Sequence, residues 1–220
     1  MEHSGVSALS IRLLGGFEFR VHGVPQPIPH QGQRVLAYLA VAALDQPCAT
    51  RRAVAGRLWP DLTNALALAR LRGSIWQANH LQRLVVADRN SLSIDQSVDI
   101  DVQHLLRWTT TIVSQQGVLD HVATGTAPTS GILLPYWDED WIEIQRIRLE
   151  QLEIHALEKM REQCRSQREI GAAIDYALRV IERDPYRESA HAALIDLYYL
   201  DGNAHAASVQ HRRYTELMNT

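Results

Sequence analysis

Four polar side chains in the stretch 64–83 carry the donors and acceptors needed to recognise another polar surface. They are Arg70, Arg72, Ser74 and Gln77. Apolar residues of the same stretch recur at helical spacing and would form its buried face: Leu68, Leu71, Ile75 and Ala78. The polar side chains would then share the opposite face, where guanidinium and amide groups can pair with base edges in the major groove of DNA. The solvated face of an ordinary amphipathic helix is the alternative.

Two further groups of side chains could bind phosphate. Arg51 and Arg52 begin a second, shorter helix, for which Thr50 is a plausible N-cap. The free N–H groups at that helix start and the two guanidinium groups could hold a phosphate together. Arg89 and Asn90 lie at a polar tip between two short apolar runs, where they could reach a phosphate or the minor groove. A surface arginine pair and a plain turn are the respective alternatives.

The charges divide unevenly along the 220 residues. Residues 1–95 hold 10 arginines against 6 acidic residues, and residues 96–220 hold 12 basic against 19 acidic residues. A basic first half could face an anion such as nucleic acid. The asymmetry favours two domains with different partners.

The elements that must position these side chains follow in a recognisable order. Period-two alternation predicts short strands within 10–28, and helical spacing predicts helices near 33–43, 51–58 and 64–83. The runs 84–86 and 92–94 then form a hairpin. A short helix, a break, a longer helix and a hairpin are typical of a winged helix-turn-helix. Trp59 and Trp76 are expected in its core.

The rest of the chain is predicted to be helical and contains a weak repeat. The interval from Ala173 to Ala207 equals that from Arg168 to Gly202, and Pro185 closes the first unit. This interval matches the period of about 34 residues that is typical of tetratricopeptide-like helix pairs, and a plain helical bundle is the alternative. We therefore expect a mainly α protein with small β-sheets. Its parts would be a disordered N-terminus (1–9), a winged helix domain (10–97) and an all-α tetratricopeptide-like domain (98–220).

Several function classes have no support in the sequence. No run of about 18 apolar residues could cross a membrane, and the first ten residues do not form a signal peptide. Cys48 and Cys164 form no disulfide framework, which fits a reducing cytoplasm. His205 and His211 have no common metal spacing, and no nucleotide-binding or hydrolase motif accompanies the acidic residues 138–140. We expect no catalysis, cofactor, metal or membrane contact, and a cytoplasmic location.

Three segments together resemble the actinomycete antibiotic regulatory proteins (SARP), a family of transcriptional activators. They are IRLLGGFEF (11–19); LWPD (58–61) with ARLRGSIW (69–76); and LLPYWDEDW (133–141) with DPYRESAH (184–191). The last is similar to the bacterial transcriptional activator domain (BTAD). The resemblance implies binding to double-stranded DNA at direct repeats, contact with RNA polymerase, and a homodimer.

One stretch departs from this family's pattern. Relatives are usually rich in arginine near the C-terminal end of the recognition helix, where this chain has Gln77, Asn79 and His80. The departure motivates a second hypothesis, a protein-interaction adaptor whose winged helix no longer binds DNA.

Overall fold

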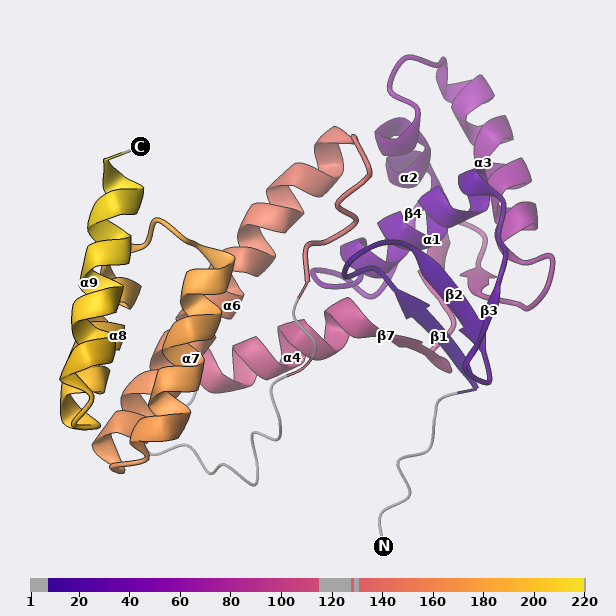
Figure 1. The fold of residues 1–220 in the computed structure, drawn as a ribbon. Helices are drawn as coiled ribbons and strands as arrows, with labels where there is room; N and C mark the ends of the chain where they lie inside the picture. The colour runs from indigo at the N-terminus through magenta and orange to yellow at the C-terminus, as the bar shows by residue number, and fades with distance from the viewer. Residues whose placement is uncertain (1–7, 115–127, 129–130, 220) are drawn as a thin grey trace, which may run out of the picture. The chain divides into compact units, whose positions relative to one another are not determined.

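The computed structural model describes residues 8–114, 128 and 131–219 (Figure 1). The chain divides into two units. The first takes in the described residues up to Leu106 and those from Pro128 through Arg146, and the second holds those of 107–114 and 147–219. The predicted domain boundary after residue 97 stays a prediction. The disordered tail expected at 1–9 lies mostly outside the described residues.

A four-stranded sheet opens the first unit. Its strand order is β3-β2-β1-β7, with β1 antiparallel to β2 and parallel to β7. The strands are β1 (Leu9–Arg12), β2 (Glu18–Val21), β3 (Val24–Gln26) and β7 (Val98–Ile100). Ile11 and Phe19 pair across β1 and β2 and are both buried, as the period-two alternation predicted.

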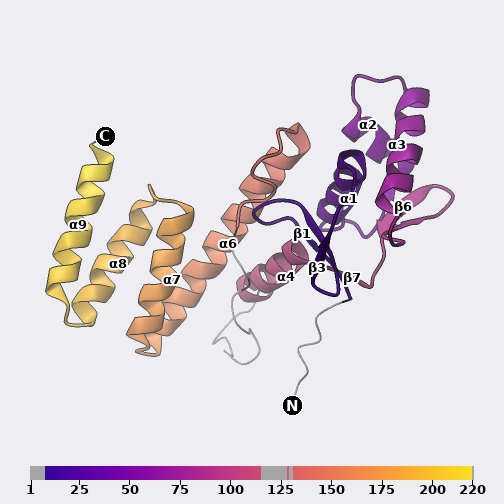
Figure 2. The same cartoon turned by 45° about the vertical axis from the view of Figure 1, so that its right-hand side comes forward.

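Three helices and a hairpin complete a winged helix-turn-helix (Figure 2). The predicted mainly α fold with small sheets is confirmed. Helix α2 begins after Thr50, whose Oγ1 accepts the N–H of Ala53 at 3.2 Å. The bounds are α1 (His30–Ala42), β4 (Ala49–Thr50), α2 (Arg51–Leu58), α3 (Asn64–Ala78), β5 (Val85–Ala87) and β6 (Ser91–Ile94).

Helix α3 ends at Ala78, before the predicted end at 83. The side chain of Asn79 is the reason. Its Oδ1 accepts the N–H groups of Leu84 and Val85 at 2.9 and 2.8 Å, and its Nδ2 donates to the carbonyl of Val85 at 3.0 Å. Asn79 therefore joins the end of α3 to the first strand of the hairpin.

A glycine lets α1 approach the C-terminal end of α3 closely. A Cβ atom at Gly32 would lie 2.9 Å from the backbone nitrogen of Ala78 and 3.0 Å from a methyl group of Ile28. Only a residue without a side chain fits such an approach. The small side chain of Ala78, which is 1% exposed, completes this contact.

The guanidinium group of Arg34, on α1, joins several elements of the first unit. It donates to both carboxylate oxygens of Glu139, at 2.7 and 3.0 Å, and to the carbonyl of Leu58 at 2.8 Å. It also lies 5.6 Å from the ring centroid of Trp59. Glu139 accepts the indole N–H of Trp141 at 2.7 Å. The side chains of Arg34 and Glu139 are only 16% and 18% exposed, so this network is largely shielded from water.

The segment before α6 (Asp140–Ser166) also pairs with the end of β1. Leu133 forms a β-bridge with Leu14, and the N–H of Leu134 donates to the carbonyl of Leu13 at 2.9 Å. The carboxylate of Asp101 accepts the N–H groups of Leu13 and Leu14. Burial raises the pKa of Asp101, and these hydrogen bonds partly oppose that shift. The carbonyls of Leu133 and Leu134 accept from Arg146.

The second unit holds helices that pack side by side with their neighbours in sequence (Figure 1). The starts of α7 and α9 are separated by one tetratricopeptide period of about 34 residues, and Ala173 and Ala207 at corresponding positions are completely buried. This supports the predicted tetratricopeptide-like repeat. The bounds are α4 (Asp101–Ser114, from residue 107 onward in this unit), α7 (Ile170–Arg183), α8 (Glu188–Leu200) and α9 (Ala204–Met218).

The turns before α7 and α9 share one backbone conformation. Arg168 has φ +64°, and Gly202, at the same position of the next repeat, has φ +76°. Glycine adopts this left-handed region readily, whereas a residue with a Cβ is strained there. The repeat therefore extends to the turns, and Arg168 occupies a position suited to glycine.

Replacing Glu139 with Gln should destabilise the first unit by about 2–3 kcal/mol, because Arg34 would lose charged hydrogen bonds in a shielded place. Urea denaturation followed by tryptophan fluorescence measures this, since four of the five tryptophans lie in that unit. The neighbouring and exposed Asp138, replaced with Asn, is the matched control and should change stability by no more than about 0.5 kcal/mol. Equal effects of the two substitutions would contradict the role given to Arg34.

Replacing Arg168 with Gly should stabilise the second unit by about 0.5–1 kcal/mol, because the relief of the left-handed conformation outweighs the extra freedom of the unfolded chain. Gly202→Ala is the converse variant and should lower stability by about 1 kcal/mol. Thermal or urea unfolding followed by circular dichroism distinguishes them, and a loss of stability on Arg168→Gly would show that the turn is not strained.

Candidate nucleic-acid interface

One line of residues runs down the middle of the exposed face of α3. Its members are all exposed and are spaced four, three and four positions apart: Ala65, Ala69, Arg72 and Trp76. At about 100° per residue this spacing keeps them within about 60° of one another around the helix axis. We call these four residues the α3 stripe. Arg72 is its only charged member, and the sequence of α3 contains no Asp or Glu.

The sequence pattern predicted the buried face of α3 only in part, since Leu71 and Ala78 are buried as expected. The buried residues are Ala67, Leu71, Ser74 and Ala78, whereas Leu68 and Ile75 are only half-buried. The helix is thus rotated by about 50° from the predicted orientation. Its small buried residues allow the close approach to α1 at Gly32, which a stripe of large apolar residues would prevent.

Two predictions for α3 were wrong as a result. Ser74, expected on the exposed face, is 3% exposed, and its hydroxyl donates to the carbonyl of Arg70 at 3.0 Å. Trp76, expected in the core, is 73% exposed. Trp59 is 8% exposed and lies in the core as predicted. The signal that could have placed Trp76 at the surface is the spacing of the small residues Ala67, Ser74 and Ala78, which share the opposite face of the helix.

Arg70 and Gln77 lie to one side of the α3 stripe. Together with Gln31 and Leu66 they line a hollow of about 500 Å³ beside α1. Gln77 is half-buried, and within the described part of the chain its Oε1 atom is buried without a hydrogen-bond partner. Arg70 is exposed, and at two positions from Arg72 it lies about 160° away around the helix.

The two arginines at the start of α2 contact different neighbours. The guanidinium of Arg51 donates to the carbonyl of Asp88 at 3.2 and 3.3 Å, and its backbone N–H donates to the carbonyl of Asn90 at 3.1 Å. Arg52 faces the first residue of α3, where the amide oxygen of Asn64, suitably oriented, accepts from it at 2.8 and 3.0 Å. The start of α2 is therefore connected both to the hairpin and to the start of α3.

Arg89 and Asn90 form the exposed tip of the hairpin. The N–H of Arg89 donates to the carboxylate of Asp88 at 2.6 Å, which shapes the turn. Asn90 contributes its carbonyl to Arg51. The predicted cations at the start of α2 and at the hairpin tip thus come together, and Arg51 also acts as a brace between them.

The acidic run before α6 has a structural role. Glu139 is held by Arg34, while Asp138 and Asp140 are exposed. Among the described residues, no three His, Cys, Asp or Glu side chains are grouped so that they could hold a metal ion. Within the same residues, no helix has the length and apolar character needed to cross a membrane.

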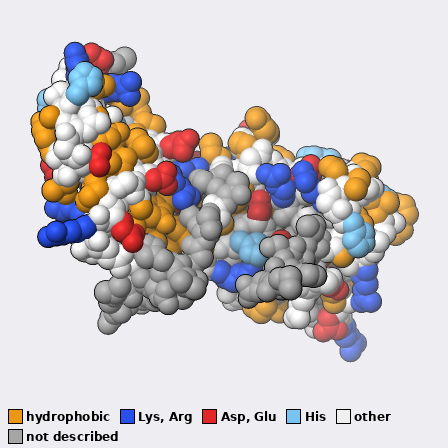
Figure 3. Space-filling model, turned by 60° about the horizontal axis from the view of Figure 1, so that its bottom comes forward, with side chains coloured by type: hydrophobic (Ala, Val, Ile, Leu, Met, Phe, Trp, Pro, Cys, Tyr) orange, Lys and Arg blue, Asp and Glu red, His pale blue; other side chains and the backbone are white. Residues whose placement is uncertain are grey.

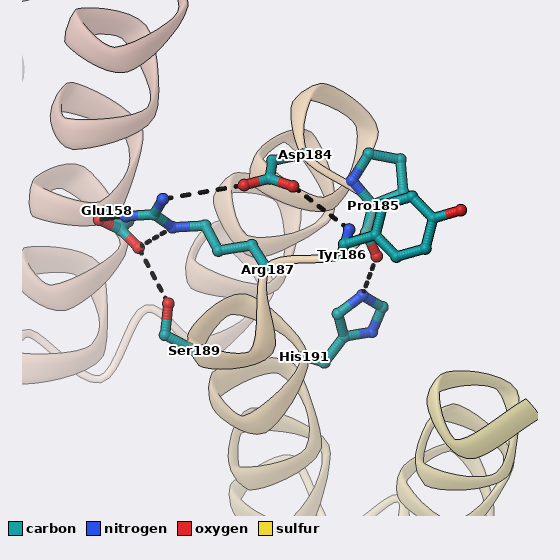
Figure 4. Close-up of polar contacts among 7 residues, drawn as sticks. All are labelled: Glu158, Asp184, Pro185, Tyr186, Arg187, Ser189 and His191. Atoms are coloured by element: carbon teal, nitrogen blue, oxygen red, sulfur yellow. Dashed lines mark hydrogen bonds and ion pairs between the residues drawn. The ribbon is translucent and has the colours of Figure 1, made fainter. Parts of the chain in front are cut away.

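The motif 184–191 forms the turn between α7 and α8 and the first residues of α8 (Figure 4). The guanidinium of Arg187 donates to both carboxylate oxygens of Glu158 on α6, at 2.9 and 3.1 Å, and these bonds raise the pKa of Arg187. His191 is buried, contacts the carbonyl of Pro185 at 2.8 Å, and stacks on Tyr214 of α9 with 4.3 Å between ring centroids. The motif therefore connects the start of α8 to α6 on one side and to α9 on the other.

Comparisons with known proteins bear on both ends of the chain. Residues 117–220 match the family model of the bacterial transcriptional activator domain. Among solved structures, the chain is similar to Mycobacterium tuberculosis EmbR in complex with a low-affinity phosphopeptide, with a TM-score of 0.68 and 21% sequence identity. The match covers 96% of this chain and 60% of the EmbR chain, so this chain spans less than two thirds of that protein. No match was found among curated proteins.

The two findings agree with the resemblance seen in the sequence. Residues 117–220 match a domain of bacterial transcriptional activators, and a winged helix-turn-helix precedes them in the chain. The fold that the chain shares with EmbR extends over both parts. Residues 117–220 therefore carry the bacterial transcriptional activator domain, and the chain as a whole shares its fold with EmbR.

Proposed function

We propose that this regulator binds double-stranded DNA sequence-specifically, with α3 in the major groove. The exposed face of α3 carries the proposal, because it combines Arg72 at its centre with the complete absence of carboxylates from the helix. A carboxylate there would repel phosphate, whereas a guanidinium can donate two hydrogen bonds to one guanine.

The remaining cations fit contacts with the DNA backbone. Arg52 at the start of α2 and Arg89 at the hairpin tip are exposed and lie on elements that flank α3. Phosphate contacts of this kind position a protein without reading sequence and make affinity fall as salt rises. Arg51 serves the same surface less directly, because its guanidinium already donates to the hairpin.

Exposed apolar side chains on the second unit favour a role for this unit in binding other proteins. Hydrophobic side chains are visible at the surface of the C-terminal helices, on the left of the space-filling view (Figure 3). The exposed apolar side chains of α8 and α9 include Tyr199, Leu200 and Met218, each 57–58% exposed. We infer that this unit forms a homodimer, and that the regulator acts at direct repeats beside a promoter and contacts RNA polymerase, as members of its family do.

Arg72→Ala should cost about 1–3 kcal/mol in binding to the best duplex selected from random DNA, and much less on a scrambled duplex. Fluorescence anisotropy with the full chain gives both affinities. Arg83→Ala removes the same charge from an exposed residue outside α3 and is the matched control. It should weaken both duplexes alike. A protein that binds no duplex would instead support the adaptor hypothesis, and equal loss of selectivity in both variants would refute the role of α3.

Self-association should depend on the last helix. Its apolar side chains include Tyr214, which is half-buried against His191, and the exposed Met218. Met218→Glu should shift the mass measured by light scattering from dimer toward monomer. Leu178→Glu, at an exposed apolar residue of α7, should leave it unchanged. A strict monomer at high concentration, both free and on DNA, would contradict the proposed dimer.

A further inference from the structure

The α3 stripe is mostly apolar, although it is exposed to water. Three of its four members are Ala65, Ala69 and Trp76, and only Arg72 is charged. The indole of Trp76 is the most exposed tryptophan side chain among the described residues, at 73%. Exposed apolar groups that lie together on one surface usually mark a binding site.

Gly73 lies in the middle of α3, beside the α3 stripe, and no contact within the described structure explains why this residue is a glycine. A Cβ atom at Gly73 would meet nothing within 4 Å, so packing within the described structure does not require glycine there. Glycine weakens a helix interior relative to alanine. A close approach by a bound partner to this side of α3 would explain why a side chain is missing.

With α3 in the major groove, as proposed above, the α3 stripe faces the floor of that groove. A·T pairs present the C5-methyl group of thymine there, which is the apolar feature of that groove. Ala69 lies about 4.5 Å before Arg72 along the helix axis, and Trp76 lies about 6 Å after it. With base pairs about 3.4 Å apart, these distances correspond to one or two base pairs on either side of the base that Arg72 contacts.

We propose that the α3 stripe reads thymine methyl groups, with Trp76 and Ala69 packing on thymines that flank the base bound by Arg72. This inference rests on the proposed DNA binding. It adds that the apolar residues of the α3 stripe select thymine. Trp76 is then a determinant of sequence specificity rather than a residue of the core.

Replacing thymine with deoxyuridine tests this, because it removes the methyl group and leaves base pairing intact. The duplex is the one that the full chain selects from random DNA, with each thymine replaced in turn. Loss of one buried methyl group should weaken binding about fourfold at the contacted positions. In Trp76→Ala the uracil and thymine duplexes should bind equally at the position next to Trp76, while the effect at the other position persists.

Two further variants separate this role of the stripe from general effects. Leu66→Ala removes an exposed apolar side chain at the edge of the hollow, outside the stripe, and should keep the full thymine preference. Gly73→Ala should make the helix more stable but weaken DNA binding, since its new methyl group would meet the groove. Thermal unfolding of each variant confirms that it is folded.

The outcomes distinguish the two proposals. If the chain selects no duplex, DNA binding itself fails, and this inference fails with it. If it binds DNA but uracil and thymine duplexes bind equally in the unchanged protein, or the selected site has no thymine within two base pairs of a guanine, only the reading of methyl groups is overturned. Trp76→Ala could instead weaken binding to all sequences equally and leave the thymine preference intact. The indole would then contact a phosphate rather than a thymine, and the reading of methyl groups would be overturned as well.

Discussion

A largely buried guanidinium group holds the first unit together. Arg34 projects from α1, yet it satisfies the last carbonyl of α2 at Leu58 and pairs with Glu139, just before α6. Burying a cation is costly unless it is fully paired, so the groups around it have little freedom to move. The end of α2 and the break at Trp59 are thereby fixed against α1, and the start of α3 follows only a few residues later. This network and the close contact at Gly32 together set the orientation of α3, on which the proposed recognition of DNA depends.

Local patterns predicted the elements well. The sequence predicted four features correctly: the strands near 10–28, the N-cap at Thr50, the hairpin, and the repeat in the C-terminal helices. Each of them depends on neighbouring residues or on a regular period. The winged helix followed by tetratricopeptide-like helices could therefore be predicted. The strand pairing of Leu14 with Leu133 could not, since nothing in either segment specifies so distant a partner in the sequence.

The candidate site was harder to predict than the fold. Sequence periodicity favoured the large residues Leu68 and Ile75 for the buried face of α3, beside Leu71 and Ala78, but the close contact with α1 brings the small Ala67 there instead. That rotation moved Ser74 into the core and Trp76 to the surface. Asn79, in the stretch where the sequence departs from the SARP pattern, connects α3 to the hairpin instead of facing outward. A tertiary contact thus decided which side chains are available for binding.

In the proposed complex the exposed face of α3 reads bases, with Arg72 at its centre. Methylation protection measures this directly, because a guanidinium bonded to guanine N7 shields that atom from dimethyl sulfate. On the duplex selected by the full chain, the unchanged protein should protect a guanine in each binding repeat, and Arg72→Ala should expose that guanine while the duplex remains bound at higher protein concentration. The same protection pattern with and without Arg72 would contradict the account.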